Sequence, residues 1–302
     1  MKPQRAKPFV KWAGGKSRLL SQLEHFLPPN LYSDNYTTYI EPFVGGGAML
    51  FHLLNKRVRM KRVVINDVNA DLISCYRFIK DSPELLIEEL HRIATLHENM
   101  PTENGKKELF YAHRTRYNRR EEYSECERAA LFLYLNHTCF NGLYRVNNQG
   151  EFNVPYGHCT KPSICNEELI RTDSELLRNT EIVILNGDYQ QVKHYVDGPN
   201  TFLYLDPPYK PLADSSNFKD YSTQPFEDEQ QVELKHFCDH LTLLGAKWML
   251  SNSDARDEEG HPFFEALYKE YHCQQVLAHR FINANGKGRS RQAEVLITNY
   301  PT

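Results

Sequence analysis

The chain has 302 residues, of which 40% are hydrophobic and 25% are charged, and its formal net charge is −3. This composition is typical of a globular protein with a sizeable core, and no apolar run approaches the roughly 18 residues of a membrane span. The N-terminal sequence MKPQRAKPFV lacks a signal-peptide core, and the seven cysteines are scattered without a CxxC pair. We therefore expect a cytoplasmic protein with reduced thiols, no membrane partner and no metal site.

Basic residues gather in three zones despite the negative net charge. Residues 1–18 and the segment HRFINANGKGRSRQ contain no acid, and the segment AHRTRYNRR lies between them in the chain. Single basic clusters are common on solvated helix faces, but three separate zones favour a surface for a polyanion. In the middle zone we expect Arg116 and Arg119 to contact phosphates.

Seven short apolar runs follow one another along the chain: TYIEPF, RVVIND, EIVILNGD, FLYLDPP, AKWMLSNS, QQVLAHR and EVLITNY. Near-continuous apolar strands that alternate with helical stretches indicate an α/β fold with a mostly parallel sheet covered on both faces. Residues 68–180, between the second and third runs, are far more than one crossover helix requires. We therefore expect one domain made of residues 1–74 and 176–302, interrupted by an insert of residues 75–175.

The expected insert is mostly helical. It opens with SPELLIEELHRIATLH, in which Ser82 caps a helix and Pro83 occupies its first turn, and it continues through the basic segment to the helix ERAALFLYLN. In the following segment CFNGLYRVNNQGEFNVPYGHC, two polar turn signals bracket LYRV and precede EFNV. This pattern is typical of a β-hairpin or of paired loops.

Three of the apolar runs end in residues suited to a nucleoside ligand, and in open α/β sheets ligands bind beyond the carboxyl ends of the strands. Gly45, Gly46 and Gly47 follow the first run, where a glycine turn lets the backbone approach a ligand closely. Asp67 ends the second run and could accept hydrogen bonds from ribose hydroxyls, or cap the next helix. Asp188 follows the third run and is a candidate acceptor for an adenine amino group, or part of a simple turn.

The fourth run ends in LYLDPPY. Two prolines stiffen the loop, so that the Asp206 carboxylate and the Pro207 carbonyl can point the same way, with Tyr209 as a flat apolar face. Two converging acceptors suit methylation of an exocyclic base amine, because they draw the amine toward a nucleophilic geometry and stabilise the charge that develops on it. Tyr209 would then stack on a base that has left the duplex, and we expect its ring rather than its hydroxyl to matter.

These motifs together resemble the N6-adenine DNA methyltransferases of the Dam type, which methylate GATC with S-adenosylmethionine. The resemblance runs nearly end to end, through FVKWAGGKSRLL, EPFVGGGAMLF, INDVNADLI, FNGLYRVNNQGEFNVPYG, GDY, YLDPPYKPL, LSNS and EVLITNY. The order of the motifs is similar to that of the alpha group of amino-methyltransferases. It implies a Rossmann-like S-adenosylmethionine-dependent methyltransferase sheet, with the insert as target-recognition domain.

The resemblance also assigns roles to individual residues. It implies catalysis by Asp206, Pro207 and Tyr209, with S-adenosylmethionine as the cofactor. The residues that it places at the cofactor are Trp12, Lys16, Phe43, Gly45, Gly47, Asp67, Asp188 and Asp206. Considered alone, Trp12 could equally be a core residue and Lys16 a surface charge.

Double-stranded DNA is the partner that the resemblance implies, and we expect no obligate protein partner. Arg145 would contact a guanine in the second half of the palindrome and Lys11 the first guanine. Leu143 and Pro155 would lie against thymine and neighbouring base edges, and Phe140 would fill the stack when adenine leaves. Asn141, in the same turn, belongs to this DNA-binding set. The alternatives are hairpin packing for the apolar residues and a phosphate contact for Arg145.

Two other functions stay open at this level. Related [N/D]PP[Y/F] loops serve the methylation of other amines, in RNA or on a protein glutamine, although the glutamine enzymes favour asparagine at the position of Asp206. The chain could also be a non-catalytic DNA-binding protein on a methyltransferase fold. The intact Asp206, Pro207 and Tyr209 speak against this second alternative.

Overall fold

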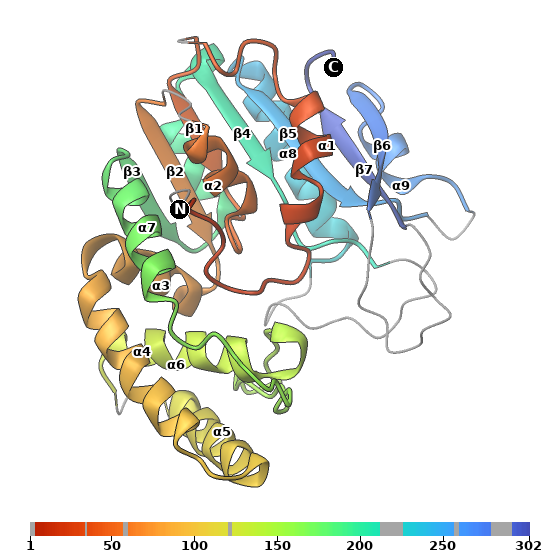
Figure 1. The fold of residues 1–302 in the computed structure, drawn as a ribbon. Coiled ribbons are helices and arrows are strands. Elements are labelled where there is room, and N and C mark those ends of the chain that lie inside the picture. Colours follow the sequence, from red (N-terminus) through yellow and green to blue (C-terminus); the bar gives the residue numbers. More distant parts are fainter. Residues whose placement is uncertain are drawn as a thin grey trace.

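A seven-stranded sheet forms the centre of the protein (Figure 1). The computed structural model describes residues 4–33, 35–56, 60–119, 123–211, 226–256, 260–278 and 292–302. The strands are β1 (Thr38–Glu41), β2 (Arg62–Asp67), β3 (Ile182–Asn186), β4 (Thr201–Leu205), β5 (Lys247–Ser253), β6 (His272–Ala278) and β7 (Gln292–Thr298). Each of the seven apolar runs seen in the sequence supplies one of them.

The strand order is β3-β2-β1-β4-β5-β7-β6. The first five strands are parallel, and β7 runs antiparallel to both β5 and β6. The order reverses between β1 and β4, which is the topological switch point where α/β sheets bind ligands. This arrangement confirms the expected Rossmann-like α/β fold with a mostly parallel sheet.

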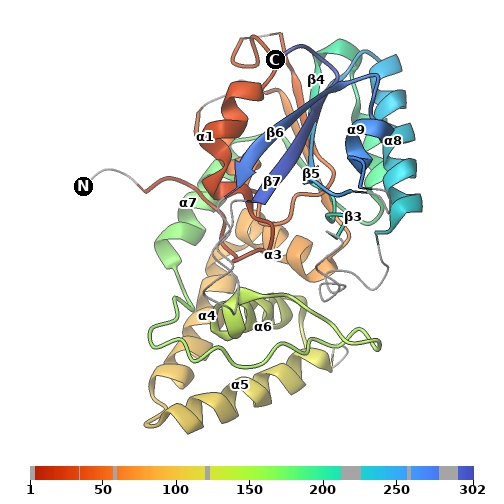
Figure 2. The ribbon, with the colours of Figure 1, turned by 90° about the vertical axis from the view of Figure 1, so that its right-hand side faces the viewer.

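Alternate residues of each strand face opposite sides of the sheet and build two separate cores. In β4, Phe202 and Tyr204 belong to one core, and Leu203 and Leu205 to the other. Figure 2 shows α1 on one side of the sheet and α8 and α9 on the other. The first face is covered by α1 (Leu20–Leu23), α2 (Ala48–Asn55), α3 (Ala70–Asp81) and α7 (Glu167–Arg178), and the second by α8 (Asp228–Leu243) and α9 (Phe263–Leu267).

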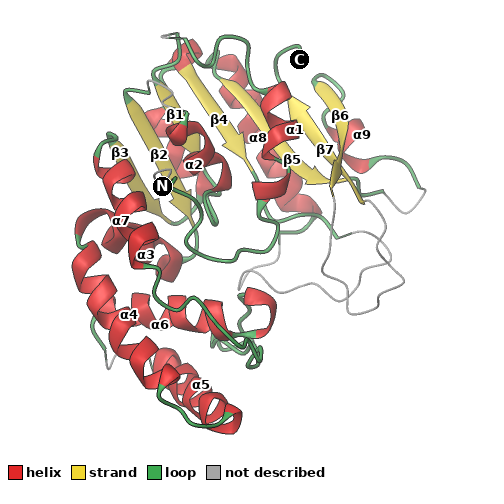
Figure 3. Ribbon diagram, in the orientation of Figure 1, coloured by secondary structure: helices red, strands yellow, loops and turns green. Residues whose placement is uncertain are grey.

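The insert places a helical layer beyond the carboxyl edge of the parallel strands (Figures 1 and 3). Its helices are α4 (Pro83–Glu98), α5 (Glu103–Asn118) and α6 (Glu125–Thr138). Ser82 occupies the N-cap position of α4 but its side chain makes no capping hydrogen bond, whereas Ser124 and Glu127 form a capping box at the start of α6. Because α6 is apolar on nearly all sides, it is buried at the centre of this layer. The segment after it, residues 139–157, folds back through two isolated antiparallel bridges, Cys139 with Tyr156 and Val146 with Phe152, which is closer to the paired loops than to a regular β-hairpin; we call it the hairpin.

The helices α3 and α7 belong to the packing of both the sheet and the insert. The expected insert bounds, residues 75 and 175, fall inside these two helices. Helix α3 contacts β2 and β3 on one side and α6 on the other. Its buried Asp71 accepts a hydrogen bond from the Tyr117 hydroxyl at 2.5 Å and pairs with Arg128, so that an ionic contact joins the sheet to the insert.

The third basic zone, with Arg280, Lys287, Arg289 and Arg291, lies outside the described residues, as do Lys2 and Arg120. Within the described ranges, no helix is long and apolar enough to cross a membrane. The same ranges contain no cluster of histidine, cysteine and acidic side chains that could hold a metal ion.

Candidate active site

The glycine turn and the LDPPY loop are neighbours because they follow adjacent strands. β1 pairs with β4 in parallel, with Ile40 opposite Leu203, so both strands end at the same edge. After β1 the backbone takes positive φ angles of 48° at Gly45 and 74° at Gly47, where a side chain would be strained. The Tyr76 hydroxyl donates to the Gly45 carbonyl at 3.0 Å and occupies the space that a Cβ on Gly47 would need.

Asp67, at the end of β2, is held by backbone N–H groups. Gly45 donates to its Oδ2 at 3.0 Å and Asn69 to its Oδ1 at 2.9 Å. Burial raises the pKa of Asp67, and these N–H groups oppose the shift. Asn69, whose side chain accepts from Leu72, caps the next helix, so Asp67 is not the capping residue. Its carboxylate therefore faces the glycine turn.

Asn66 joins the loops that follow the first three strands. Its buried side-chain amide donates to the Pro42 carbonyl at 2.9 Å and to the Gly187 carbonyl at 3.0 Å, and it accepts from Gln191 at 2.7 Å. Asp188, next to Gly187, is exposed and caps the short helix η5 (Tyr189–Tyr195) by accepting from the Gln190 N–H. The turn role considered for Asp188 is therefore present in the structure.

Phe43 is half-buried beside the same loops. Its ring lies 5.1 Å from that of Tyr189 at an interplanar angle of 31°, and Phe226 meets it edge-on at 6.1 Å. The strand ends thus bring Phe43 together with Asp67, Asp188 and the glycine turn. Flat apolar and acceptor groups at one edge are the chemistry that a nucleoside requires.

A buried ammonium lies beside the LDPPY loop. Lys16 is only 3% exposed, and its Nζ lies 2.8 Å from Oδ1 of Asp206 and 2.7 Å from the Gly14 carbonyl. The same Nζ is 4.5 Å from the centroid of the Tyr209 ring, over its face. Burial raises the pKa of Asp206, and the charge of Lys16 opposes this shift. Lys16 is therefore an internal partner of the loop and not a surface charge.

The rest of the loop is clamped by side chains from α8, β5 and β7. The Pro208 carbonyl accepts from Gln231 at 3.2 Å, Asn252 accepts from the Lys210 N–H at 3.1 Å, and the Ser253 hydroxyl donates to the Lys210 carbonyl at 2.6 Å. The hydrogen bonds between described residues include none to the Pro207 carbonyl, which is the second acceptor expected for the base amine.

The Tyr209 hydroxyl also has a partner, since it donates to Oε2 of Glu294 on β7 at 2.8 Å. Sequence reasoning missed Glu294, Gln231 and the role of Asn252. The motifs LSNS and EVLITNY contain two of these residues, but their periodicity indicated only strands.

Trp12 connects the glycine turn to the hairpin of the insert. A Cβ on Gly45 would lie 2.8 Å from Cδ1 of Trp12, so the indole covers the turn. On its other side the indole stacks on Tyr144, with centroids 5.9 Å apart and an interplanar angle of 23°. Trp12 thus contacts both parts of the molecule, as a core residue and as a wall of the turn.

The residues expected at DNA gather around the hairpin. Lys11 is exposed and packs against Gly142, while Phe140 is 48% exposed and Asn141 and Pro155 are exposed beside it. The Phe140 N–H donates to the Pro155 carbonyl at 2.9 Å, which brings the two ends of the hairpin segment together.

Two hairpin residues are half-buried. Leu143 packs against the first core, and Arg145 donates through Nε to Oδ1 of Asn153 at 2.7 Å. In the basic zone on α5, Arg116 pairs with Glu127 at 2.8 Å and lies over the Tyr123 ring, whereas Arg119 is exposed at the end of the helix.

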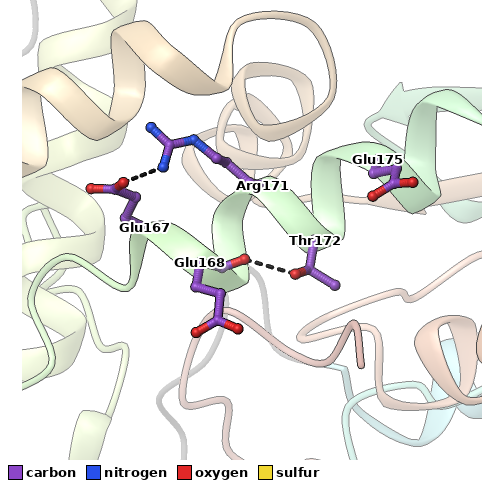
Figure 4. A pocket seen from close by; sticks show the side chains of 5 residues that line it. All are labelled: Glu167, Glu168, Arg171, Thr172 and Glu175. Atoms are coloured by element: carbon purple, nitrogen blue, oxygen red, sulfur yellow. Dashed lines mark hydrogen bonds and ion pairs between the residues drawn. The ribbon is translucent and has the colours of Figure 1, made fainter. Parts of the chain in front are cut away.

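A hollow of about 420 Å³ lies elsewhere, on the surface of α7. Figure 4 shows its lining, where Arg171 pairs with Glu167 and the Thr172 hydroxyl donates to the Glu168 carbonyl. None of the expected site residues lines the hollow. We therefore place the active site at the strand ends and not here.

Comparison with known proteins identifies the family. The profile of the D12 class N6 adenine-specific DNA methyltransferases matches residues 12–281. The type II methyltransferase M.MjaIII of Methanocaldococcus jannaschii is 45% identical over 296 residues, covering 97% of this chain and 99% of that protein. Type II methyltransferase M1.LlaDCHI of Lactococcus lactis subsp. cremoris is 40% identical over 297 residues, covering 97% of this chain and 95% of that protein. The DNA adenine methylase of Escherichia coli K12 is 31% identical over 301 residues, covering 100% of this chain and 97% of that protein. The chain belongs to the D12 class of N6 adenine-specific DNA methyltransferases.

Proposed function

We propose that this protein methylates N6 of adenine within GATC in double-stranded DNA, with S-adenosylmethionine as methyl donor. One observation carries the proposal: the Asp206 carboxylate and the Pro207 carbonyl sit on a clamped loop directly beside the glycine turn. Two acceptors next to a cofactor turn suit an exocyclic amine that must be oriented toward a methyl group.

The residues at the strand ends fit the cofactor. Asp67 offers carboxylate oxygens to ribose hydroxyls, Phe43 offers a flat face, and the positive φ angles of Gly45 and Gly47 let the chain turn tightly beside them. Trp12, Lys16, Asp188 and Asp206 complete the set that we assign to it. When bound, the cofactor supplies an electrophilic methyl group.

The chain's own groups orient the base. Asp206 Oδ1 is held by Lys16, and we assign its Oδ2 and the Pro207 carbonyl to the two N6–H bonds of adenine. Accepting both hydrogens localises the nitrogen lone pair, and the two oxygens stabilise the positive charge that develops on N6. Because burial raises the pKa of Asp206, its carboxylate is a better acceptor for the proton that N6 loses.

We assign the choice of target sequence to the hairpin. We assign residues 75–175 to target recognition, with residues 1–74 and 176–302 forming the catalytic part. Lys11 and Arg145 are the two cations that would contact guanines, and Phe140 is exposed where a base leaves the stack. Leu143, Asn141 and Pro155 would contact base edges, while Arg116 and Arg119 would contact phosphates.

Transfer of a labelled methyl group to duplex DNA, RNA and protein, offered side by side, tests the reaction. Transfer to duplex DNA alone is the expected result, and transfer to RNA or protein instead would overturn it. Plasmid from cells that express the protein is then challenged with a nuclease blocked by adenine methylation of GATC. Unprotected plasmid from an active enzyme would mean that the hairpin recognises another site.

A further inference from the structure

Glu294 is a buried carboxylate that the reaction described above does not use. It is 6% exposed and accepts the Tyr209 O–H at 2.8 Å. Because β7 is antiparallel to β5, with Glu294 opposite Ser253, the beginning of β7 lies at the same edge as the end of β5. Glu294 thus reaches the LDPPY loop from a strand whose start, and not its end, faces the site.

A carboxylate at this position is costly for the fold. Its neighbours on β7, Val295 and Ile297, are buried apolar residues, whereas Glu294 places a second carboxyl group near that of Asp206. One ammonium, that of Lys16, lies beside Asp206 and over the Tyr209 ring. Burying two carboxylates beside one cation does not stabilise a protein by itself, so a function other than stability is needed to explain it.

Two contacts define the orientation of the Tyr209 ring. The hydrogen bond to Glu294 fixes the direction of the ring axis, because it holds the hydroxyl at the far end of the side chain. Lys16 lies over one ring face and fixes the tilt. Burial keeps the pKa of Tyr209 well above its usual value, so the hydroxyl retains the proton that it donates.

We propose that Glu294 is a positioning residue for methyl transfer: by holding the Tyr209 hydroxyl, it sets the plane on which the target adenine stacks beside Asp206. This inference rests on the proposed function. It also gives the hydroxyl of Tyr209 a role, whereas the sequence led us to expect that only the ring face matters.

A double-mutant cycle tests the proposal with the full-length protein, measuring the single-turnover rate of methyl transfer to duplex DNA. Misplacing a stacking surface costs on the order of 10-fold or more in rate, so Glu294→Ala and Tyr209→Phe should each be slowed by about that factor. The double variant should be no slower than either single one, because both remove the same contact. Glu294→Gln keeps an acceptor oxygen and should recover most of the rate, while cofactor affinity stays unchanged in all variants.

Tyr271→Phe is the matched control. The Tyr271 hydroxyl donates to Asp239 at 2.7 Å, a similar tyrosine–carboxylate bond next to the start of β6, at the opposite edge of the sheet. This variant should lose some thermal stability and keep the wild-type rate.

Four results would overturn the inference: a wild-type rate in Tyr209→Phe, a wild-type rate in folded Glu294→Ala, multiplying losses in the double variant, or no recovery in Glu294→Gln. Tyr209→Phe keeps the test decisive if Glu294→Ala does not fold. A wild-type protein that transfers no methyl group to duplex DNA would instead overturn the proposed function, and this inference with it.

Discussion

The side chain of Asn136 binds both backbone polar groups of Lys11, which lies 125 positions earlier in the chain. The Lys11 N–H donates to Oδ1 at 2.9 Å, and Nδ2 donates to the Lys11 carbonyl at 2.8 Å and to the Gly142 carbonyl at 3.1 Å. Because Asn136 is 2% exposed, water cannot replace these bonds. One amide therefore fixes the cation expected at the first guanine relative to the hairpin expected at the second.

Asn136→Ala should relax target choice as well as lower stability. Unsatisfied buried groups cost about 1–3 kcal/mol each, so a lower melting temperature is expected. Rates on GATC duplexes and on duplexes with one altered base should converge, because Lys11 and the hairpin lose their common anchor.

Asn299→Ala is the matched control, since Asn299 makes a similar pair of backbone bonds to Trp248 and Ala246 away from the hairpin. It should lower the melting temperature and leave discrimination intact. Equal discrimination in both variants would contradict the role of Asn136.

The strands could be predicted from the sequence because buried strands are apolar nearly throughout. Burial on both faces is what makes the runs around Val64 and Leu203 visible without any alignment. The residues at the strand ends were found by assuming that ligands lie beyond carboxyl ends. Glu294 was not predicted in this way because it lies at the start of an antiparallel strand, and no local pattern in EVLITNY reveals the direction of that strand.

The contacts that the N-terminal segment makes at the site could not be predicted from the sequence either. The contacts of Lys16 with Asp206, of Trp12 with Tyr144 and of Lys11 with Asn136 join residues more than a hundred positions apart. They depend on how the N-terminal segment crosses the sheet edge. Chain order and composition contain no information on that path.

Asp206→Asn should strongly reduce turnover with the fold retained. Asparagine keeps the size of the side chain but removes the charge and presents a donor to the base, and loss of one preorganised acceptor costs on the order of 10²-fold in rate. Asp206→Ala is the poorer variant, because it leaves the buried Lys16 without its carboxylate. Cofactor binding and thermal unfolding verify the fold, and near-normal turnover in folded Asp206→Asn would remove Asp206 from the mechanism.

Gly47→Ala should disrupt the glycine turn that we assign to the cofactor. The residue has a φ of 74°, and a Cβ would meet the Tyr76 hydroxyl, which holds the Gly45 carbonyl. Gly260→Ala is the control that introduces backbone strain without a steric clash, because Gly260 has a φ of 86° and nothing lies within 4 Å of its Cβ position. The control should lose about 1–2 kcal/mol through backbone strain alone. Weaker binding of S-adenosylmethionine by Gly47→Ala only, measured by calorimetry, is the expected result.

Arg145→Ala should change which base is accepted, at a cost of about 1–3 kcal/mol at one position of the site. Arg119→Ala should instead weaken binding to all sequences alike and lower the salt slope of the affinity by about 0.9. Binding to GATC and to single-base variants, measured over a range of salt concentrations, separates the two effects. A uniform loss in Arg145→Ala would show that this arginine contacts phosphate.

Asp173 on α7 has a buried carboxyl group that is not among the residues assigned to the reaction. Its Oδ1 accepts the Lys7 N–H at 3.0 Å, and its Oδ2 has no hydrogen-bond partner among the described residues. Burial raises the pKa of Asp173 from 3.8 to about 8, although the Lys7 N–H opposes the shift. We therefore expect this carboxyl to hold its proton in the folded protein at neutral pH.

This shift should make stability fall as pH rises. Between pH 3.8 and about 8 the folded state keeps a proton on Asp173 that the unfolded chain has lost, so the unfolded state binds fewer protons and each step up in pH favours unfolding. Asp173→Asn is neutral at every pH, keeps the acceptor for Lys7 and should flatten this part of the profile. Melting temperatures of both proteins at pH 5, 6, 7 and 8 check the expectation. Parallel curves would show that Asp173 is already ionised at pH 5, and that burial does not hold its proton.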